Sequence, residues 1–161
     1  MKSQGEIEAA VCDGISRFQQ EFIGRGPKDI HAHLIGALLL VHLQGVLTPA
    51  ERQLIGSRVE AHNGDGRTAG GVSTGGNGNG NGNGNGNGNG NGNDNGNGRS
   101  LLKQVRSHMV ATGRQRLESI IEQAVGVKLV SVHHDISTVT GEEIIVFSLV
   151  APPTCRPKKK A

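Results

Sequence analysis

The chain has 161 residues, a net charge of +3 at pH 7 and two cysteines. Tyrosine and tryptophan are absent and phenylalanine occurs three times, so the chain lacks the stacking platforms that most single-strand and RNA binders use. Two cysteines make no disulfide framework, and we find neither a secretory leader nor an apolar run of the roughly 20 residues that a membrane helix needs, so we expect a cytoplasmic protein.

The first predicted element is a helix from about Ser3 to Ile23. Apolar residues recur there at spacings of three and four, which places them on one stripe of a helix. The stripe consists of Ile7, Val11, Ile15, Phe18 and Phe22. Gly24 directly follows and is a typical residue type at a helix end.

A β-hairpin and a short helix are predicted next. The two strands are expected at Asp29–Ile35 and Leu38–Gln44. Gly36 occupies the first central position of the two-residue connection, which is typical of a tight hairpin turn. A short helix should begin at Pro49, because Thr48 and Glu51 have the spacing of a capping box.

Residues 60–98 are predicted to be a disordered insertion. Asn-Gly dipeptides fill residues 77–98, interrupted once by Asp94. Neither residue type favours helices or strands, and nothing in the segment is apolar enough to offset the entropy lost on ordering. A Gly-rich coil of this length has an r.m.s. reach of roughly 35 Å, and it costs only about 1.5 kcal/mol more closure entropy than a short connection. A folded domain can therefore continue across it.

The second half repeats the order of the first. A helix is expected from about Ser100 to Ala124, with Gly113 as a weak point near its middle and Gly126 at its end. Its predicted stripe consists of Leu102, Val105, Met109, Leu117, Ile120, Ile121 and Ala124. Two strands then follow as a second hairpin, at Val127–Ile136 and Glu143–Val150.

These elements predict an α+β fold. The two hairpins would pair into one four-stranded antiparallel sheet with the long helices on one face, a two-layer sandwich in the order αββα-αββ. Residues 1–59 and 99–150 are each marginal for independent folding, so we expect them to be two halves of one domain. Residues 151–161 should form a disordered basic tail.

Three motifs resemble a bacterial family of small proteins, the MpsC domain of a sodium-translocating, membrane potential-generating system. They are Gly24-Arg25-Gly26-Pro27, Gly45-Val46-Leu47-Thr48-Pro49-Ala50-Glu51, and Asp135-Ile136-Ser137-Thr138 followed by Thr140-Gly141-Glu142. Residues 99–106, RSLLKQVR, open the second long helix in the same way. The insertion departs from the family pattern, which has a short connection at that place. The resemblance implies a small protein that works beside membrane proteins that move ions or inorganic carbon.

We therefore expect a non-enzymatic accessory or adaptor protein of a membrane transport complex, with no cofactor and no small-molecule substrate. Free sheet edges favour a homo-oligomer, a dimer. The basic tail could add a weak contact with anionic lipid at the membrane surface. The alternative is a nucleic-acid-binding or regulatory module, whose phosphate contacts would come from the second long helix through Lys103, Arg106, Arg114 and Arg116.

Five residues are candidates for contact with a partner or an anion. Arg25 and Lys28 place two cations on a glycine-containing turn, where an acidic surface could bind, although solvated cations on a plain turn are the simpler interpretation. Asp135, Thr138 and Glu142 concentrate carboxylates and a hydroxyl at the end of a hairpin. Local turn hydrogen bonds are the simpler interpretation there.

Zinc binding and nucleophilic catalysis are two further possibilities, each with a simpler explanation. His31 and His33 share a strand face, so with His42 across the hairpin they could bind zinc, whereas strand histidines more commonly face solvent. Ser137 could be activated by His134 or Asp135, but sequence neighbours on a strand point to opposite faces. We find no phosphate-binding loop after a strand and no nucleophile elbow.

Overall fold

The structure is a computed structural model that describes residues 1–56 and 94–157. The predicted α+β class is confirmed. In chain order the elements are α1 (Gln4–Phe18), the π-helical turn η1 (Gln19–Ile23), β1 (Asp29–Ile35), β2 (Leu38–Gln44), α2 (Pro49–Gly56), α3 (Asp94–Thr112), α4 (Arg114–Val125), β3 (Leu129–Ile136) and β4 (Glu143–Leu149). Of the predicted insertion, residues 60–93 lie outside the described part of the chain.

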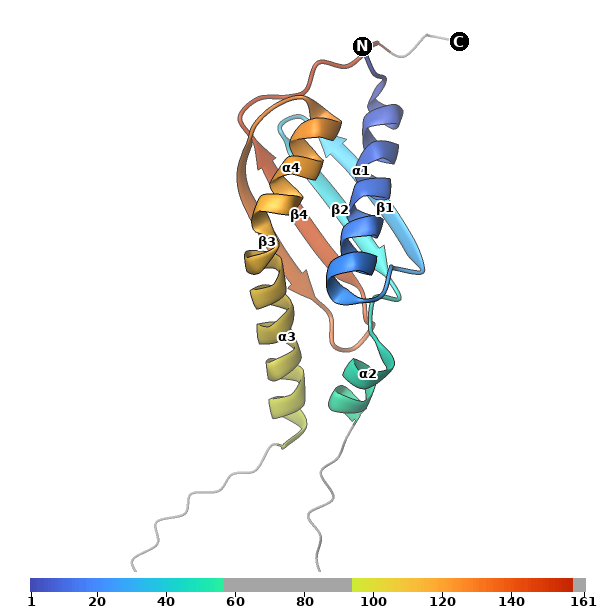
Figure 1. The fold of residues 1–161 in the computed structure, drawn as a ribbon, viewed down its shortest axis with the longest axis vertical. Coiled ribbons are helices and arrows are strands. Elements are labelled where there is room, and N and C mark those ends of the chain that lie inside the picture. Colours follow the sequence, from blue (N-terminus) through green and yellow to red (C-terminus); the bar gives the residue numbers. More distant parts are fainter. Residues whose placement is uncertain (57–93, 158–161) are drawn as a thin grey trace, which may run out of the picture.

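The four strands form one antiparallel sheet in the order β1-β2-β4-β3 (Figure 1). The predicted bounds of β1 and β2 are confirmed, and Gly36 in their turn has a φ of 60°. Strand β3 begins two residues later than predicted, and a bulge between Leu129 and Ser131 breaks its register with β4. At the centre of the sheet β2 pairs with β4, so hydrogen bonds between these strands join the halves that precede and follow residues 57–93.

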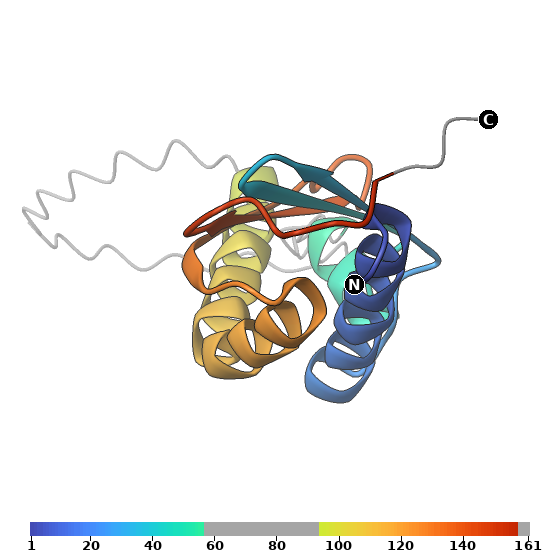
Figure 2. The ribbon, with the colours of Figure 1, turned by 90° about the horizontal axis from the view of Figure 1, so that it is seen from above.

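All helices lie on one face of the sheet, as Figure 2 shows. The apolar core between the layers takes side chains from both halves of the chain. Its fully buried members include Val11, Ile15 and Phe18 of α1, Leu39, Val41 and Leu43 of β2, Leu117 and Ile121 of α4, and Ile145 and Phe147 of β4. Each such side chain contributes roughly 1.5–3 kcal/mol by leaving water, so most of the stabilising burial depends on the two halves being together.

Helix α1 and the turn η1 together have the predicted extent of the first helix, but the winding changes at Gln19. Ser3 and Glu6 form a capping box at its start, with the Ser3 amide 2.6 Å from the Glu6 carboxylate. Over Gln19–Ile23 the chain widens into a π-helical turn, and Gly24 ends it with a φ of 93°. This turn places the Gln19 side chain in the interior, fully buried, where the apolar stripe of the sequence predicted no polar residue.

The capping box of α2 is confirmed. The Glu51 amide donates to the Thr48 hydroxyl at 3.2 Å, and the Thr48 amide donates to the Glu51 carboxylate at 2.8 Å. Both backbone donors at the start of this short helix are thereby satisfied. Helix α2 begins at Pro49, as predicted.

The second long helix is two helices, which corrects the prediction of a single one. It breaks at Gly113, which is buried against α1: a Cβ atom there would lie 2.6 Å from Cζ of Phe18. Any larger residue at this position would overlap the Phe18 ring of α1, so glycine is needed where α1 packs against the junction of α3 and α4. Helix α3 also begins at Asp94, earlier than the predicted Ser100. Aspartate is a favoured residue type at a helix start, a signal that the surrounding repeat obscured.

The start of the predicted tail is ordered, which differs from the expectation for residues 151–161. Residues 151–157 are described, and Arg156 forms a β-bridge with Ser3. The Arg156 amide donates to the Lys2 carbonyl at 2.9 Å, while Pro153 is buried. Contacts with the amino-terminal segment hold residues 151–157 in place. The local sequence, which is basic and rich in proline, gives no indication of these long-range contacts.

Candidate functional site

Three segments that are distant in sequence gather at the end of the molecule that holds α2 (Figure 1). We call this the motif end; it comprises the turn 24–28, the stretch 45–56 and the loop 137–142. The Lys28 amide donates to the Gln44 carbonyl at 2.8 Å, which ties the turn to the start of the stretch. The loop packs on the stretch so closely that a Cβ atom on Gly141 would lie 3.0 Å from Cδ1 of Leu47.

The loop 137–142 is fixed by its own hydrogen bonds. The Ser137 amide donates to the Glu142 carbonyl at 2.8 Å, and the Gly141 amide donates to the Ser137 carbonyl at 2.9 Å. The Ser137 hydroxyl accepts from the Thr140 amide at 3.2 Å. Gly141 adopts a φ of 72°, which disfavours any other residue. These contacts support the turn interpretation of the hydroxyl-rich loop.

A cavity of about 320 Å³ lies between α2 and this loop. Arg52 lines it from α2, and Thr138 and Gly141 line it from the loop. Gly45 and Leu47 complete the wall. The cavity is therefore built from both halves of the chain and from two of the three motifs.

A second cavity, of about 390 Å³, lies on the other side of the same loop. Asp135, Thr138 and Glu142 all line it, so the structure brings together three of the five predicted contact residues. Lys103 of α3 also lines this cavity. Thr138 lines both cavities, which makes the loop the wall between them.

The carboxylates of the second cavity each have a partner. Lys103 Nζ lies 2.9 and 3.2 Å from the two carboxylate oxygens of Asp135. The hydrogen bond from Lys103 lowers the pKa of Asp135 below its ordinary value. Glu142 Oε2 lies 2.9 Å from Nε2 of His42. The two carboxylates that line this cavity are therefore both paired.

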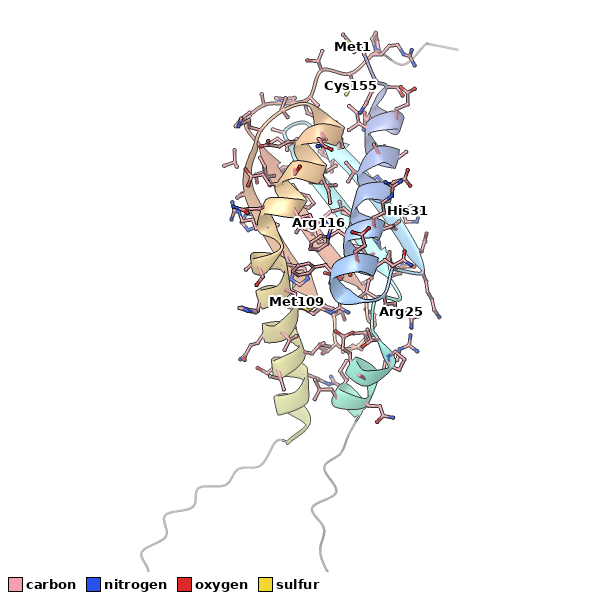
Figure 3. All side chains as sticks on the ribbon, in the orientation of Figure 1. Met1, Arg25, His31, Met109, Arg116 and Cys155 are labelled. Atoms are coloured by element: carbon pink, nitrogen blue, oxygen red, sulfur yellow. The ribbon has the colours of Figure 1, made fainter. Side chains whose placement is uncertain are left out.

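Arg25, Lys28 and Arg52 form no ion pair within the described part of the chain. Lys28 covers Gly45, since a Cβ atom on that glycine would lie 2.6 Å from Cγ of Lys28. Arg52 lines the first cavity, whereas Lys28 lies beside it, against Gly45 of the cavity wall. Arg25 follows the end of α1 on the side of α2 (Figure 3). The motif end thus presents cations whose charge is not balanced locally.

Beneath the motif end lies a buried ion pair. Arg106 of α3 is fully buried, with its Nε and Nη2 atoms each 2.7 Å from one carboxylate oxygen of Glu51 in α2. Its Nη2 also donates to the Val46 carbonyl at 2.9 Å. This bidentate contact fastens α2, which precedes residues 57–93, to α3, which follows them.

A second buried carboxylate extends this ion pair into a network. Glu143 at the start of β4 is fully buried, and its Oε2 accepts from the Gln19 amide at 3.0 Å and lies 3.5 Å from Nη1 of Arg106. Its Oε1 lies 2.7 Å from Nε2 of His134. Because a carboxylate only accepts hydrogen bonds, His134 donates through Nε2; its buried Nδ1 has no partner among the described residues.

The hydrogen-bond network favours the ionised form of the Glu51 carboxyl group. Burial raises its pKa, but hydrogen bonds from Arg106 and from the Thr48 backbone outweigh burial, so that its pKa lies below the ordinary value. The carboxylate is therefore the stable form in the folded protein at neutral pH.

The structure places the four cations considered for phosphate contact on the second long helix in different surroundings. Arg106 cannot reach a phosphate from the interior, Lys103 is bound to Asp135, and Arg116 is paired with Glu21. Arg114 reaches only the Val130 carbonyl, at 3.5 Å. Of the four cations, only Arg106 is withdrawn from the surface, whereas Lys103, Arg114 and Arg116 are exposed.

The sequence did carry a signal for the buried arginine. The predicted stripe ran through Leu102, Val105 and Met109, but Val105 is 44% exposed. The buried residues are Leu102, Arg106 and Val110, which recur at a spacing of four. A stripe that is defined by apolar residues alone omits Arg106, although the helical spacing places it on the same face as Leu102 and Val110.

The histidines considered for zinc lie on the open sheet face, opposite the helices. His31 and His42 are register neighbours on β1 and β2, and His33 lies two residues along the same face. His31 is 3.0 Å from Asp29, and His42 is bound to Glu142. Within residues 1–56 and 94–157, no group of three or more potential ligands is placed to hold a metal ion.

The helices of the described residues were also considered as membrane spans. In that part of the chain, none combines the length and the hydropathy that crossing a bilayer requires.

The model of the MpsC family, described as a Na⁺-translocating membrane potential-generating system, matches residues 3–63 and 93–151. The match includes every segment of the motif end and leaves out most of the Asn-Gly repeat. The chain is 28% identical to YbcI of Bacillus subtilis (strain 168), described as an uncharacterized protein, over 92% of this chain and 89% of that protein. No solved structure matches. The predicted resemblance is confirmed, and the chain belongs to the MpsC family.

Proposed function

We propose that this chain is a non-enzymatic accessory protein of a Na⁺-translocating, membrane potential-generating system, and that it binds a membrane component of that system through the motif end. The name of the family supports the link to such a system. The observation that carries the proposal is the gathering of the family motifs around two open cavities at one end of the molecule.

The construction of the motif end favours a protein partner over a substrate. The loop 137–142 is held by internal hydrogen bonds, and α2 is held by the Arg106–Glu51 pair, so both walls of the first cavity are preorganised. The Ser137 hydroxyl accepts a hydrogen bond from the Thr140 amide, so it helps to hold the turn. A rigid, shallow, cationic surface suits recognition of an acidic segment.

The charges indicate the chemistry of the partner. Arg52 lines the first cavity and Lys28 lies beside it against Gly45, both without an ion pair among the described residues, and Arg25 lies at the same end of the molecule (Figure 3). The carboxylates on the other side of the loop are paired with Lys103 and His42. An acidic cytoplasmic loop of a membrane protein fits these free cations, and the contact would weaken as salt is added.

The carboxyl-terminal tail has a smaller role in this proposal than its composition suggests. Arg156 lies 3.6 Å from Glu6 and bridges Ser3, so it contributes to the fold. Lys158, Lys159 and Lys160 lie outside the described residues. Three cations near anionic lipid would supply roughly 1 kcal/mol each, too little for binding without a protein partner.

The test is recovery of a partner from membranes of the host. The tagged full chain is cross-linked in cells, membranes are solubilised and bound proteins are identified. We expect the unmodified chain to recover an ion-transport component, and the double variant Lys28→Glu, Arg52→Glu to recover at least tenfold less of it. Lys128→Glu is the matched control, because this exposed residue precedes the opposite end of β3.

The outcomes separate clearly. Loss of recovery with the double variant but not with Lys128→Glu supports binding through the motif end. Equal recovery of the component by all three proteins contradicts the assigned surface. Failure of the unmodified chain to recover any transport component contradicts the proposed function itself.

A further inference from the structure

The sheet face opposite the helices is apolar at its centre, and no helix or strand of residues 1–56 and 94–157 covers it. Strands β2 and β4 place four aliphatic side chains there, Leu38, Leu40, Ile144 and Val146. Leu38 is 47% exposed and Ile144 is 41% exposed, and Ile35 on the adjacent β1 is 63% exposed. The uncovered face of an antiparallel sheet normally carries polar residues, so a face of this composition indicates an interaction surface.

We propose that this open face binds the open face of a second copy of this chain, which would form the homodimer that the sequence predicts. This inference goes beyond the proposed function. The open face meets the second cavity at Asp135 and Ile144, whereas the first cavity, with Arg52, is not part of the face. The register of the sheet defines three rows that cross all four strands. In the order β1, β2, β4, β3 they are His31-His42-Ile144-Asp135, His33-Leu40-Val146-His133 and Ile35-Leu38-Ser148-Ser131.

Of two orientations of a twofold axis between the facing sheets, parallel to the strands and across them, the first matches the rows to each other better. An axis parallel to the strands places β1 over the second copy's β3, and β2 over its β4. His31 then faces Asp135 of the other copy, and Leu40 faces Val146. An axis across the strands would instead place His31 over Ile35 and Asp135 over Ser131, which leaves the His31 ring opposite an apolar side chain and the Asp135 carboxylate opposite a neutral hydroxyl. A contact between this ring and this carboxylate, in addition to their own-chain contacts with Asp29 and Lys103, therefore favours the axis parallel to the strands.

The area of the face sets the expected strength of the dimer. Three rows over four strands cover roughly 400 Å² per copy at ordinary strand spacing. Two copies would bury roughly 800 Å² in flat projection, with more from the relief of the side chains, against about 1,200 Å² at the lower end of stable interfaces. We therefore expect reversible association with a dissociation constant in the micromolar range rather than an obligate dimer.

Sedimentation velocity of the full chain at several concentrations tests the proposal. The unmodified protein should shift from monomer to dimer between about 1 and 100 µM. Leu40→Lys places a charge at the centre of the face and should weaken association at least tenfold, while the fold is retained because the side chain points away from the core. Leu101→Lys is the control, since Leu101 on α3 is 46% exposed, nearly the same as the exposure of Leu38.

A cross-linking variant tests the axis. His31→Cys combined with Asp135→Cys should form a disulfide-linked dimer when diamide is added as the oxidant, whereas each single substitution should not link β1 to β3 of the other copy. Within one chain these positions are separated by two intervening strands, roughly 14 Å, which is too far for a disulfide.

Three results would overturn the proposal. The first is an unmodified protein that stays monomeric at every concentration. The second is a dimer that Leu40→Lys leaves intact, which would place the interface elsewhere. The third is a monomer whose recovery of a membrane component is lost with Leu40→Lys, which would assign the open face to that partner. Since Lys28→Glu, Arg52→Glu should remain dimeric, failure of this inference and failure of the proposed function are distinguishable.

Discussion

Arg106 is the residue on which the interior of the motif end depends. It is fully buried and contacts the Glu51 carboxylate through two hydrogen bonds of 2.7 Å, with Glu143 at 3.5 Å. Burial of a charge is tolerated only when partners satisfy it, and these partners come from α2 and β4. The side chain therefore acts as a connector of elements from both halves of the chain.

Arg106→Ala should destabilise the protein by about 3–5 kcal/mol, because it leaves two carboxylates without their buried cation. Lys103→Ala is the matched control, one turn earlier on the same helix, where an exposed ion pair contributes only about 0–1 kcal/mol. Urea unfolding measures both. Equal, small losses for the two variants would contradict the role assigned to Arg106.

The lowered pKa of Glu51 gives the stability a defined dependence on pH. A carboxyl group whose folded-state pKa lies below the unfolded value, here near 4.5, adds stability that is present above that value and is lost as the pH falls through the folded pKa. The urea midpoint should therefore decline below about pH 4.5. Glu51→Gln should be less stable at pH 7 and show a shallower decline, whereas a decline as steep as that of the unmodified protein would contradict the assignment.

At the scale of elements, glycines decide where helices can cross. Gly113 separates α3 from α4 and lies against Phe18, and Gly14 of α1 lies against Ile120 of α4, where an added Cβ would be 2.3 Å from a methyl carbon. Glycine at both sites allows α1 to approach α4 and the junction of α3 and α4 closely. A side chain at either position would force the helices apart or displace an apolar neighbour.

Gly113→Ala should destabilise the protein by about 1–2 kcal/mol, because overpacking against Phe18 outweighs the gain in helix propensity. Gly5→Ala in α1 is the contrasting control: no atom lies within 4 Å of its added Cβ, so it should stabilise by about 0.5–1 kcal/mol. Thermal unfolding distinguishes the two. Stabilisation by Gly113→Ala would show that the crossing is looser than described.

The elements also show which parts of the fold a sequence can specify. The first hairpin was predicted to the residue, because alternation and a turn glycine are local signals. The break at Gly113 and the burial of Gln19 depend on contacts with distant residues and were not predictable locally. Asp135, Thr138 and Glu142 line one cavity and are near neighbours in sequence, so their grouping was predictable, whereas Arg52 meets Thr138 at the other cavity only through the packing of α2 on the loop.

At the scale of the whole molecule, β2 and β4 form a seam between the two halves. Val41 is paired with Ile145 across this seam, and both are fully buried. The motif end lies at one end of the seam and takes α2 from the first half and the loop 137–142 from the second. Neither half contains a complete motif end, so the proposed binding surface exists only when the halves are together.

Deleting residues 64–92, which the family model does not match, should preserve the fold. Shortening a connection in this way lowers its closure entropy, so the free energy of unfolding should rise by about 1 kcal/mol. Chemical denaturation of the deletion variant provides the measurement. A loss of stability or of the two-state transition would mean that the deleted residues make contacts that the fold needs.

The most direct test of a motif end assembled from both halves is to cut the chain between them. A protease site placed within residues 64–92 of the full chain is cleaved, and the product is examined by size exclusion and by recovery of the membrane component. We predict that the two fragments stay together as a 1:1 complex and recover the component as the intact chain does. Fragments that separate under native conditions, each remaining folded, would contradict the shared interior and with it the assembled motif end.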